Sequence, residues 1–254
     1  MAVLPSDVDE KIRPLGNPPI VEAAIHWQAR ARKPFDLEGW KSGLSERLVG
    51  YGTPETIHQL QAMLLFQADE PAVSADSKQF VDGLRFTSDD KLHIAQIKRD
   101  GVVFSRLKPY ENWERFTEAA LRIWRIYLDF ALPDDIQRLG VRFINQIPLA
   151  GFDSLGRVLD APPTCPANLP LNEFVYQSTF LVPNQPYAIR VIKLMQPQAR
   201  GGEKAPGLFV DCDVYSTKPI SREPKAIDEA LADMRLLKNR IFFSLLTEDI
   251  LKQF

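Results

Sequence analysis

The order of secondary-structure elements that the sequence predicts for the first half of the chain recurs in the second half. Each half opens with a strand, continues with a helix and three or four further strands, and ends with a long helix. The stretch from Pro18 to Trp27 opens the first half, and the stretch from Leu139 to Pro148 opens the second. A recurring order of elements predicts two similar modules that enclose one core.

Hydrophobic periodicity locates the individual elements. Alternation with a period of two predicts strands, and apolar residues three and four apart predict helices. The predicted strands cover residues 20–27, 57–67, 79–87, 91–98, 102–106, 137–147, 172–182, 187–195 and 207–215. The predicted helices cover residues 34–49, 111–131, 154–159 and 225–251. The acidic, proline-containing stretch 68–78 predicts a loop, and the glycine-containing stretch 196–206 predicts a flexible connection.

These elements predict an α+β fold of two pseudo-repeated βαβββα-like modules. Their antiparallel sheets are expected to pack around the long helices of residues 111–131 and 225–251. Residues 1–17 form an irregular lead-in, residues 18–132 the first module, and residues 133–254 the second. The two modules are expected to form one compact unit, and the sequence leaves open whether their sheets are separate or fused.

The composition narrows the class of protein and its partners. Hydrophobic residues make up 45% and charged residues 25% of the chain, as in ordinary globular proteins. The 31 basic and 33 acidic residues leave a formal charge of -2. The chain therefore has no overall positive field that would hold a phosphate backbone, and nucleic acid is disfavoured as a partner.

The cysteines, the N-terminus and the apolar runs of the chain predict its location in the cell. Only Cys165 and Cys212 occur, which does not support a disulfide framework and favours a reducing compartment. The N-terminus lacks the basic start and apolar centre of a secretion signal. No apolar run approaches the roughly 18 residues that a membrane-spanning helix needs. The sequence therefore predicts a cytoplasmic protein without a membrane segment.

A charge pair on the two opening strands is the first candidate site. Aligning these strands at Val21 and Val141 sets Glu22 opposite Arg142. A carboxylate and a guanidinium can form a bidentate, charge-assisted pair that fixes the register between two modules. A coupling role between the modules is the favoured interpretation, and a role in ligand binding is the alternative.

Two further polar residues accompany this pair. Asn145 shares a strand face with apolar residues and is expected to satisfy a backbone group there. His26 shares a face with Glu22, but four residues along a strand separate them by roughly 13 Å, too far for a direct bond. The candidate residues for ligand binding or inter-module coupling are Glu22, His26, Arg142 and Asn145.

Searches for catalytic and metal-binding patterns find none. The three histidines show no metal-ligand spacing, and neither a phosphate loop nor a nucleophile elbow is present. Asp211 and Asp213 are interpreted as exposed carboxylates on one strand face, and Cys212 on the other face as a small buried hydrophobic residue. The sequence thus predicts no catalytic residue, no metal and no cofactor.

Three segments of the sequence resemble a known family. They are Pro18-Pro19-Ile20-Val21-Glu22-Ala23, then Phe104-Ser105-Arg106-Leu107 with Tyr110 and Trp113, and Leu139-Gly140-Val141-Arg142-Phe143-Ile144-Asn145. Together they resemble a sporadically distributed, uncharacterised bacterial protein family of about this length. The family usually has a tyrosine where this chain has Phe143. The resemblance implies no activity, but a patchy distribution suits an accessory system such as defence or toxin neutralisation.

These observations favour a non-enzymatic regulatory or protein-interaction protein of a bacterial accessory system over an enzyme. Its expected partner is another protein or a second copy of the chain. The alternative is a small-molecule-binding or hydrolytic module with a cavity between its two halves.

Overall fold

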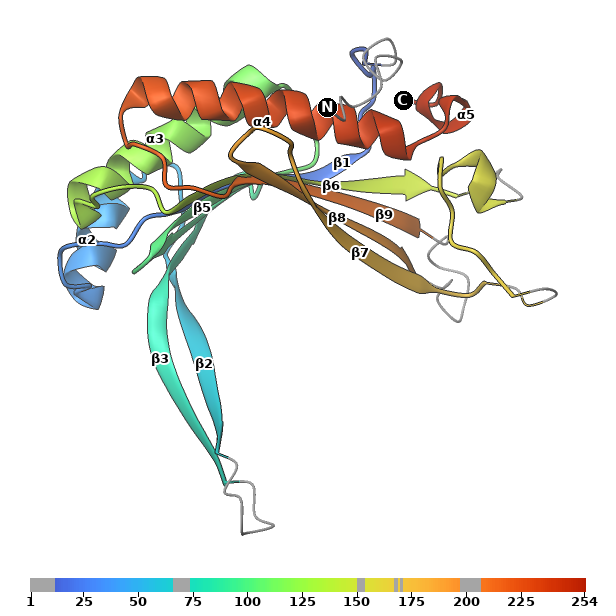
Figure 1. The fold of residues 1–254 in the computed structure, drawn as a ribbon. Helices are drawn as coiled ribbons and strands as arrows, with labels where there is room; N and C mark the ends of the chain where they lie inside the picture. Colours follow the sequence, from blue (N-terminus) through green and yellow to red (C-terminus); the bar gives the residue numbers. More distant parts are fainter. Residues whose placement is uncertain (1–11, 66–73, 150–153, 167–168, 170, 197–206) are drawn as a thin grey trace.

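A single antiparallel sheet of nine strands forms the framework of the molecule (Figure 1). The computed structural model describes residues 12–65, 74–149, 154–166, 169, 171–196 and 207–254. The strand order is β2-β3-β4-β5-β1-β6-β9-β8-β7. The strands of the first half are β1 (Ile20–Gln28), β2 (Glu55–Leu65), β3 (Ser74–Thr87), β4 (His93–Lys98) and β5 (Gly101–Leu107). Those of the second half are β6 (Arg138–Pro148), β7 (Phe174–Leu181), β8 (Tyr187–Gln196) and β9 (Gly207–Ser216).

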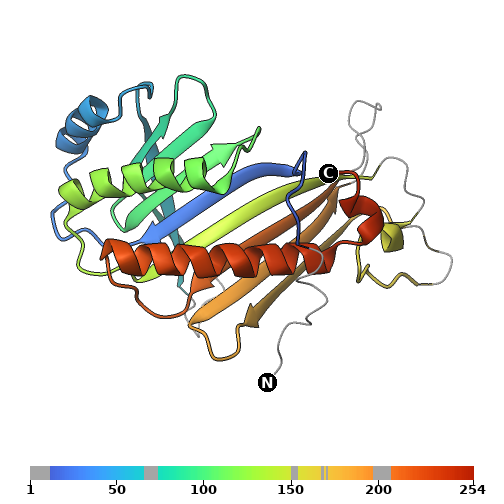
Figure 2. The same ribbon diagram turned by 90° about the horizontal axis from the view of Figure 1, so that it is seen from above.

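The long helices lie on one face of this sheet (Figure 1, Figure 2). They are α3 (Trp113–Ala131) and α4 (Pro224–Leu245), and the shorter α2 (Leu37–Arg47) packs beside α3. The predicted α+β class is confirmed. The sequence left open whether the sheets are separate or fused, and the structure shows one fused sheet with the long helices on one face, not enclosed by sheets. The two opening strands pair directly with each other, which fuses both halves into one sheet and leaves its second face without a described helix.

Residues of the two central strands alternate between these faces. On β1, Ala23, Ile25 and Trp27 are buried beneath the helices, because successive strand residues point to opposite sides. The same cluster of buried side chains includes Val141 and Phe143 from β6. One hydrophobic core therefore contains residues from both halves.

Helix α3 follows its sequence closely. Asn112 is the N-cap, and its side chain accepts a hydrogen bond from the Arg115 N–H at 2.9 Å. The helix ends at Ala131, and its C-cap residue Leu132 has a left-handed backbone with φ of 48°. Its predicted apolar stripe is buried, and Trp124 stacks on Trp27 of β1 with ring centres 5.5 Å apart. This stripe anchors the helix layer on the sheet.

The end of the chain differs from the prediction of one helix to residue 251. α4 ends at Leu245, and α5 (Glu248–Leu251) follows after a break. Leu246 at the break has an extended backbone and forms a β-bridge with Leu159. Because of the break, the last apolar residues of the chain pack against the end of the sheet and form a second hydrophobic cluster there. These residues include Leu246, Ile250 and Leu251.

The first hairpin and the short predicted helix also differ from the sequence-based boundaries. β2 and β3 pair from Glu55 to Leu65, so strand structure begins at Ser74 inside the stretch predicted as a loop. Backbone pairing overrides the weak strand composition there. The pair projects from the rest of the sheet (Figure 1). The predicted helix at residues 154–159 is a single 3-10 turn, Leu155–Arg157.

Several predictions fall outside the described residues. They concern residues 1–11 of the lead-in, residues 66–73 of the predicted loop and residues 197–206 of the predicted connection. Asn17, in the described part of the lead-in, donates its backbone N–H to the carbonyl oxygen of Phe254 at 2.6 Å. None of the described helices combines the length and the apolar character that crossing a membrane requires.

Candidate functional site

The structure divides the four predicted site residues between the two faces of the sheet. Glu22 and His26 of β1 and Arg142 of β6 lie on the face without helices, on adjacent strands. Asn145 of β6 lies on the helix-covered face and is 3% exposed. The first three therefore share one surface, and the fourth belongs to a different environment.

Arg142 forms the expected bidentate pair, but with a different carboxylate. Its Nε lies 3.0 Å from Oδ1 of Asp211 on β9, and its Nη2 lies 2.6 Å from Oδ2. The hydrogen bonds to Asp211 raise the pKa of Arg142, and the charge of Glu22 makes the smallest contribution. In the register, Glu22 lies opposite Ile144, whereas Arg142 lies opposite Ala24. Asp211 has the same two-residue offset on β9, where Asp213 lies directly opposite Arg142, so the register alone does not select Asp211 over Glu22.

The prediction that Asp211 and Asp213 are exposed is wrong. Asp211 is only 7% exposed, and Asp213 is half-buried in a 2.8 Å salt bridge with Arg138 Nη2. Burial raises the pKa of the Asp213 carboxyl, and Arg138 opposes this effect. Both aspartates are covered because their neighbours on β6 carry long arginine side chains that fold over them.

Gly140 leaves room for this arrangement. A Cβ at Gly140 would lie 2.8 Å from Nη1 of Arg138 and 3.3 Å from Oδ1 of Asp213. Without a side chain there, Arg138 lies across β6 and also reaches Nδ1 of His26 at 3.3 Å. Burial, followed by the charge of Arg138, lowers the pKa of His26 to about 4. His26 is therefore neutral at pH 7, and its Nδ1 accepts a hydrogen bond.

These contacts make the helix-free face a network of paired charges. Arg142 is paired with Asp211, and Arg138 with Asp213. Such buried or half-buried pairs fix the register of neighbouring strands. This arrangement supports a structural role for the predicted residues on this face.

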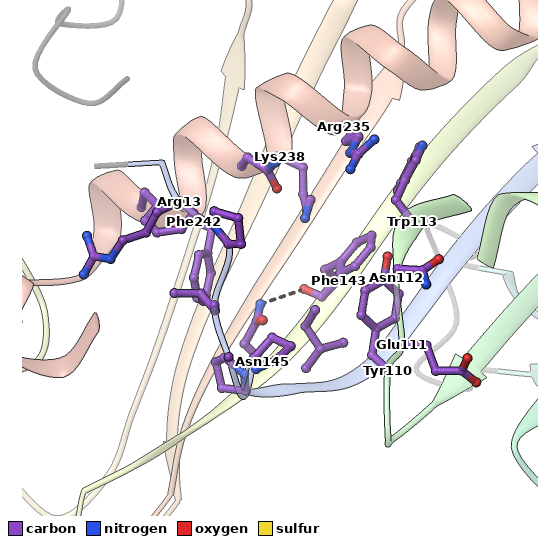
Figure 3. Close-up of a pocket in the computed structure, with 18 of the residues that line it drawn as sticks. Arg13, Tyr110, Glu111, Asn112, Trp113, Phe143, Asn145, Arg235, Lys238 and Phe242 are labelled. Carbon is purple, nitrogen blue, oxygen red and sulfur yellow. Dashed lines mark hydrogen bonds between the residues drawn. The ribbon is translucent and has the colours of Figure 1, made fainter. Parts of the chain in front are cut away.

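A pocket lies on the other face, between the lead-in, the start of α3, β6 and α4 (Figure 3). Its volume is about 310 Å³. Both halves of the chain contribute to its walls. The lining residues are Arg13, Pro14, Leu15, Gly16, Pro18, Pro19, Ile20, Tyr110, Glu111, Asn112, Trp113, Glu114, Phe143, Asn145, Arg235, Lys238, Asn239, Phe242 and Phe243.

Lys238 of α4 extends into this pocket toward Phe143 (Figure 3). Its Nζ lies 4.0 Å from the centre of the Phe143 ring, which is a cation-π contact. Among the described residues, the Lys238 ammonium has neither a hydrogen-bond acceptor nor a salt-bridge partner. Burial lowers the pKa of Lys238 to about 8, and the nearby charge of Arg235 acts in the same direction.

The other charged side chains that line the pocket have partners. Arg235 Nη1 lies 3.0 Å from Oε1 of Glu114. Glu111 pairs with Arg106 and Arg115 outside the pocket, and Arg13 lies 3.2 Å from Glu248. Lys238 is therefore the lining cation that lacks a compensating carboxylate within the described residues.

Aromatic rings form much of the wall around Lys238. The ring of Phe143 lies 5.4 Å from that of Tyr110 and 6.4 Å from that of Trp113. Asn145, below them, donates from Nδ2 to the Val210 carbonyl oxygen at 3.0 Å. The prediction that Asn145 satisfies a backbone group is confirmed. The pocket thus combines an apolar aromatic wall with one uncompensated positive charge.

Sequence reasoning missed Lys238, although the sequence holds a signal. The residue follows Met234 by four positions and precedes Phe242 by four, so it lies half-buried on the apolar stripe of α4. A lysine at an apolar helical position is unusual, because burying an ammonium group is costly. The aromatic wall residues Tyr110, Trp113 and Phe143 lie in the segments that carry the family resemblance.

The cysteines and acidic groups add no metal centre within the described residues, where no group of three potential ligands occurs. Cys165 is exposed, and Cys212 is fully buried on β9. Burial raises the pKa of the Cys212 thiol to about 12. The prediction that Cys212 is a small buried hydrophobic residue is confirmed.

Comparison with known proteins adds no identification. No family model, no curated protein and no solved structure matches this chain. The function is therefore inferred from the geometry of the pocket.

Proposed function

We propose that this protein binds a small organic molecule in the pocket between the lead-in, α3, β6 and α4. The observation that carries this proposal is the Lys238 ammonium group, which lies inside an aromatic pocket without a partner among the described residues. A buried ammonium group without a counterion lowers the stability of the folded protein. A ligand that interacts with it explains why a lysine occupies this position on the apolar stripe of α4.

The size and the walls of the pocket support the same function. Its volume of about 310 Å³ lies at the lower end of the range for small-molecule sites, which are mostly apolar with a few polar groups. Tyr110, Trp113 and Phe143 supply the apolar surface. Asn239 and Lys238 on α4 supply polar groups.

A pocket-filling variant tests this function. Asn239 lines the pocket, whereas Leu236 on the same helix is 47% exposed, so Asn239→Trp fills the pocket and Leu236→Trp is its matched control. We expect the purified wild-type chain and Leu236→Trp to retain a small molecule that mass spectrometry detects after denaturation. We expect Asn239→Trp to lack it. Equal retention by all three chains, or stabilisation by no member of a metabolite library, contradicts the proposal.

A second candidate is association with another copy of the chain through β7. In the part of the chain that the structure describes, β7 is an edge strand with β8 as its one neighbour. Four large apolar side chains on it are at least half exposed: Val175, Tyr176, Phe180 and Leu181. A charge-free, apolar edge strand is a template for pairing with a further strand.

The sequence of β7 fits antiparallel pairing with itself. A two-fold axis through Ser178 sets Val175 opposite Leu181 and Tyr176 opposite Phe180. The two residues of each pair are an even number of positions apart along the strand, so their side chains lie on the same face of the sheet. Aromatic and aliphatic pairs of this kind stabilise neighbouring strands.

Three finer inferences accompany these proposals. We infer that the two halves are pseudo-repeats, supported by a strand order in which each opening strand pairs with the last strand of its own meander. We also propose a regulatory role in a bacterial defence or toxin-neutralising system, on the basis of the family resemblance. A cytoplasmic location is proposed from the use of cysteine.

A further inference from the structure

We propose that the ligand of this pocket is a small organic anion with a flat apolar body. Its negative group contacts Nζ of Lys238, and its body lies against the aromatic wall formed by Tyr110, Trp113 and Phe143. This inference rests on the proposed function, because it names the class of molecule that the pocket binds.

The charge of the pocket selects an anion. The lining residues include Arg13, Arg235, Lys238, Glu111 and Glu114, so the cations outnumber the carboxylates by one. Arg235 and Glu114 neutralise each other at 3.0 Å, and Arg13 lies beside Glu248 outside the pocket. The uncompensated charge therefore lies on the Lys238 ammonium group. A carboxylate or phosphate in contact with that group forms a charge-assisted hydrogen bond in surroundings that water screens weakly.

The arrangement of the aromatic side chains selects a flat apolar body. Trp113 is half-buried, and its ring lies 22° from parallel to that of Phe143. Arg235 stacks at 5.5 Å from the centre of the Trp113 ring, which holds this indole in place. Burial raises the pKa of Tyr110, so its phenol stays neutral and does not repel an anion. A pocket of about 310 Å³ has room for a molecule with one or two rings.

Imine formation with a carbonyl compound is the other chemistry of such a lysine, and it requires the neutral amine. Burial lowers the pKa of Lys238 to about 8 and so raises the share of neutral amine, but at pH 7 the ammonium form still predominates. That form contacts the Phe143 ring at 4.0 Å. Glu111 and Glu114 are held by arginines, so neither carboxylate is placed to take a proton from Lys238.

Matched acids and amides test the class of ligand. The probes are small aromatic carboxylates, beginning with benzoate and phenylacetate, and their primary amides, which have nearly the same shape without the charge. Titration calorimetry and thermal shift are measured on the full chain. We expect the carboxylates to bind at least ten-fold more tightly than the amides.

Variants of Lys238 connect this preference to the site. Lys238→Met is expected to abolish the preference for acids, and Lys238→Arg to keep it. Lys225→Met is the matched control, because Lys225 lies on the same helix and its side chain is 89% exposed. A melting temperature at or above that of the wild type in Lys238→Met shows that loss of binding is not loss of folding.

The dependence on pH gives an independent readout. The charged and titratable groups around Lys238 are Arg235 on α4, Cys212 on β9, Tyr110 and Glu111 just before α3, Glu114 in its first turn, and Arg13 of the lead-in. Cys212 and Tyr110 stay uncharged below pH 9, because burial raises the pKa of each. The affinity for benzoate is therefore expected to fall about ten-fold per pH unit above pH 8 in the wild type. It is expected to stay constant in Lys238→Arg.

Each outcome distinguishes this inference from the function on which it rests. If amides bind as tightly as acids and Lys238→Met changes neither, the pocket binds small molecules but not as an anion site. If borohydride traps benzaldehyde on the wild type but not on Lys238→Met, Lys238 acts as an imine-forming amine and the anion assignment is overturned. If neither acids nor amides bind, the ligand class is contradicted, and the proposed function stands or falls separately with the retained molecule and the metabolite library.

Discussion

At the scale of single residues, charged side chains are accommodated in two different ways on the two faces of the sheet. On the helix-free face, Arg142 and Asp211 form a bidentate pair, and each satisfies the other. On the helix-covered face, Lys238 contacts an aromatic ring and has no acid beside it among the described residues. The paired charges are suited to fix strand register, whereas the unpaired charge is suited to contact a ligand.

Lys238→Met is predicted to stabilise the folded protein without ligand. Burial lowers the pKa of Lys238 from 10.5 to about 8, which corresponds to a penalty of about 3 kcal/mol on its charged form. The penalty is fully present below pH 8, and it disappears as the pH rises to 10.5, where the unfolded chain also loses the proton. Urea unfolding at pH 6.5 and pH 9.5 is expected to show a gain of about 2 to 3 kcal/mol that shrinks at the higher pH.

The control for this prediction is Lys225→Met, which removes an exposed lysine from the same helix. Its free energy of unfolding is expected to stay within about 0.5 kcal/mol of the wild type at both pH values. A loss of stability in Lys238→Met at pH 6.5 would mean that the ammonium group is compensated in the folded protein.

The sequence predicts the environment of some of these residues but not of others, for a physical reason. Alternation along a strand correctly assigns Asn145 and Cys212 to the buried face. It does not predict that Asp211 is buried, because the cover comes from Arg142 on a neighbouring strand. The sequence also paired Arg142 with Glu22 instead of Asp211, since pairing between strands depends on register, which is not local in the sequence.

At the scale of secondary-structure elements, β7 is the element that most invites association. Its exposed apolar side chains extend along an edge that has no described partner strand. Native proteins commonly protect such an edge with charged residues. The charge-free strand Phe174–Leu181 therefore stands out among the elements of this sheet.

Phe180→Lys is predicted to prevent association through β7. Two copies paired about Ser178 bring Phe180 of one copy beside Tyr176 of the other, so the substitution places a charge in an apolar contact. Light scattering after gel filtration is expected to show a dimer for the wild type and a monomer for Phe180→Lys. Val49→Lys is the matched control, because Val49 is 75% exposed and lies away from β7. A wild-type monomer at all measured concentrations would exclude this association.

Elements with strong local patterns were predicted well, and those shaped by distant contacts were not. Helix α3 has an apolar stripe and an Asn112 cap, so its limits were predicted within two residues. The break at Leu246 was missed, because the helical pattern continues through it and only the bridge to Leu159 interrupts the helix. The extended pairing of β2 with β3 was also missed for lack of a local signal.

At the scale of the whole molecule, the pairing of β1 with β6 joins the two halves. Eight residues of β1 are in register with β6, and the main core contains side chains from both halves. The smaller cluster at the far end of the sheet consists mostly of second-half residues, including Leu208 and Val210. A shared core and a continuous sheet predict that both halves unfold in one transition.

The tryptophans provide a direct test of this cooperativity. All four lie in the first half, at Trp27, Trp40, Trp113 and Trp124, so their fluorescence reports mainly on that half, although Trp113 also contacts Phe143 and Arg235 of the second half. Leu208 is fully buried in the second-half cluster, and Leu208→Ala is expected to cost about 2 to 5 kcal/mol. If the chain unfolds as one unit, this substitution lowers the urea midpoint measured by tryptophan fluorescence as much as the midpoint measured by circular dichroism. If the fluorescence midpoint stays unchanged while the circular dichroism midpoint falls, the two halves unfold independently. The pocket between them would then lose one of its walls before the first half unfolds.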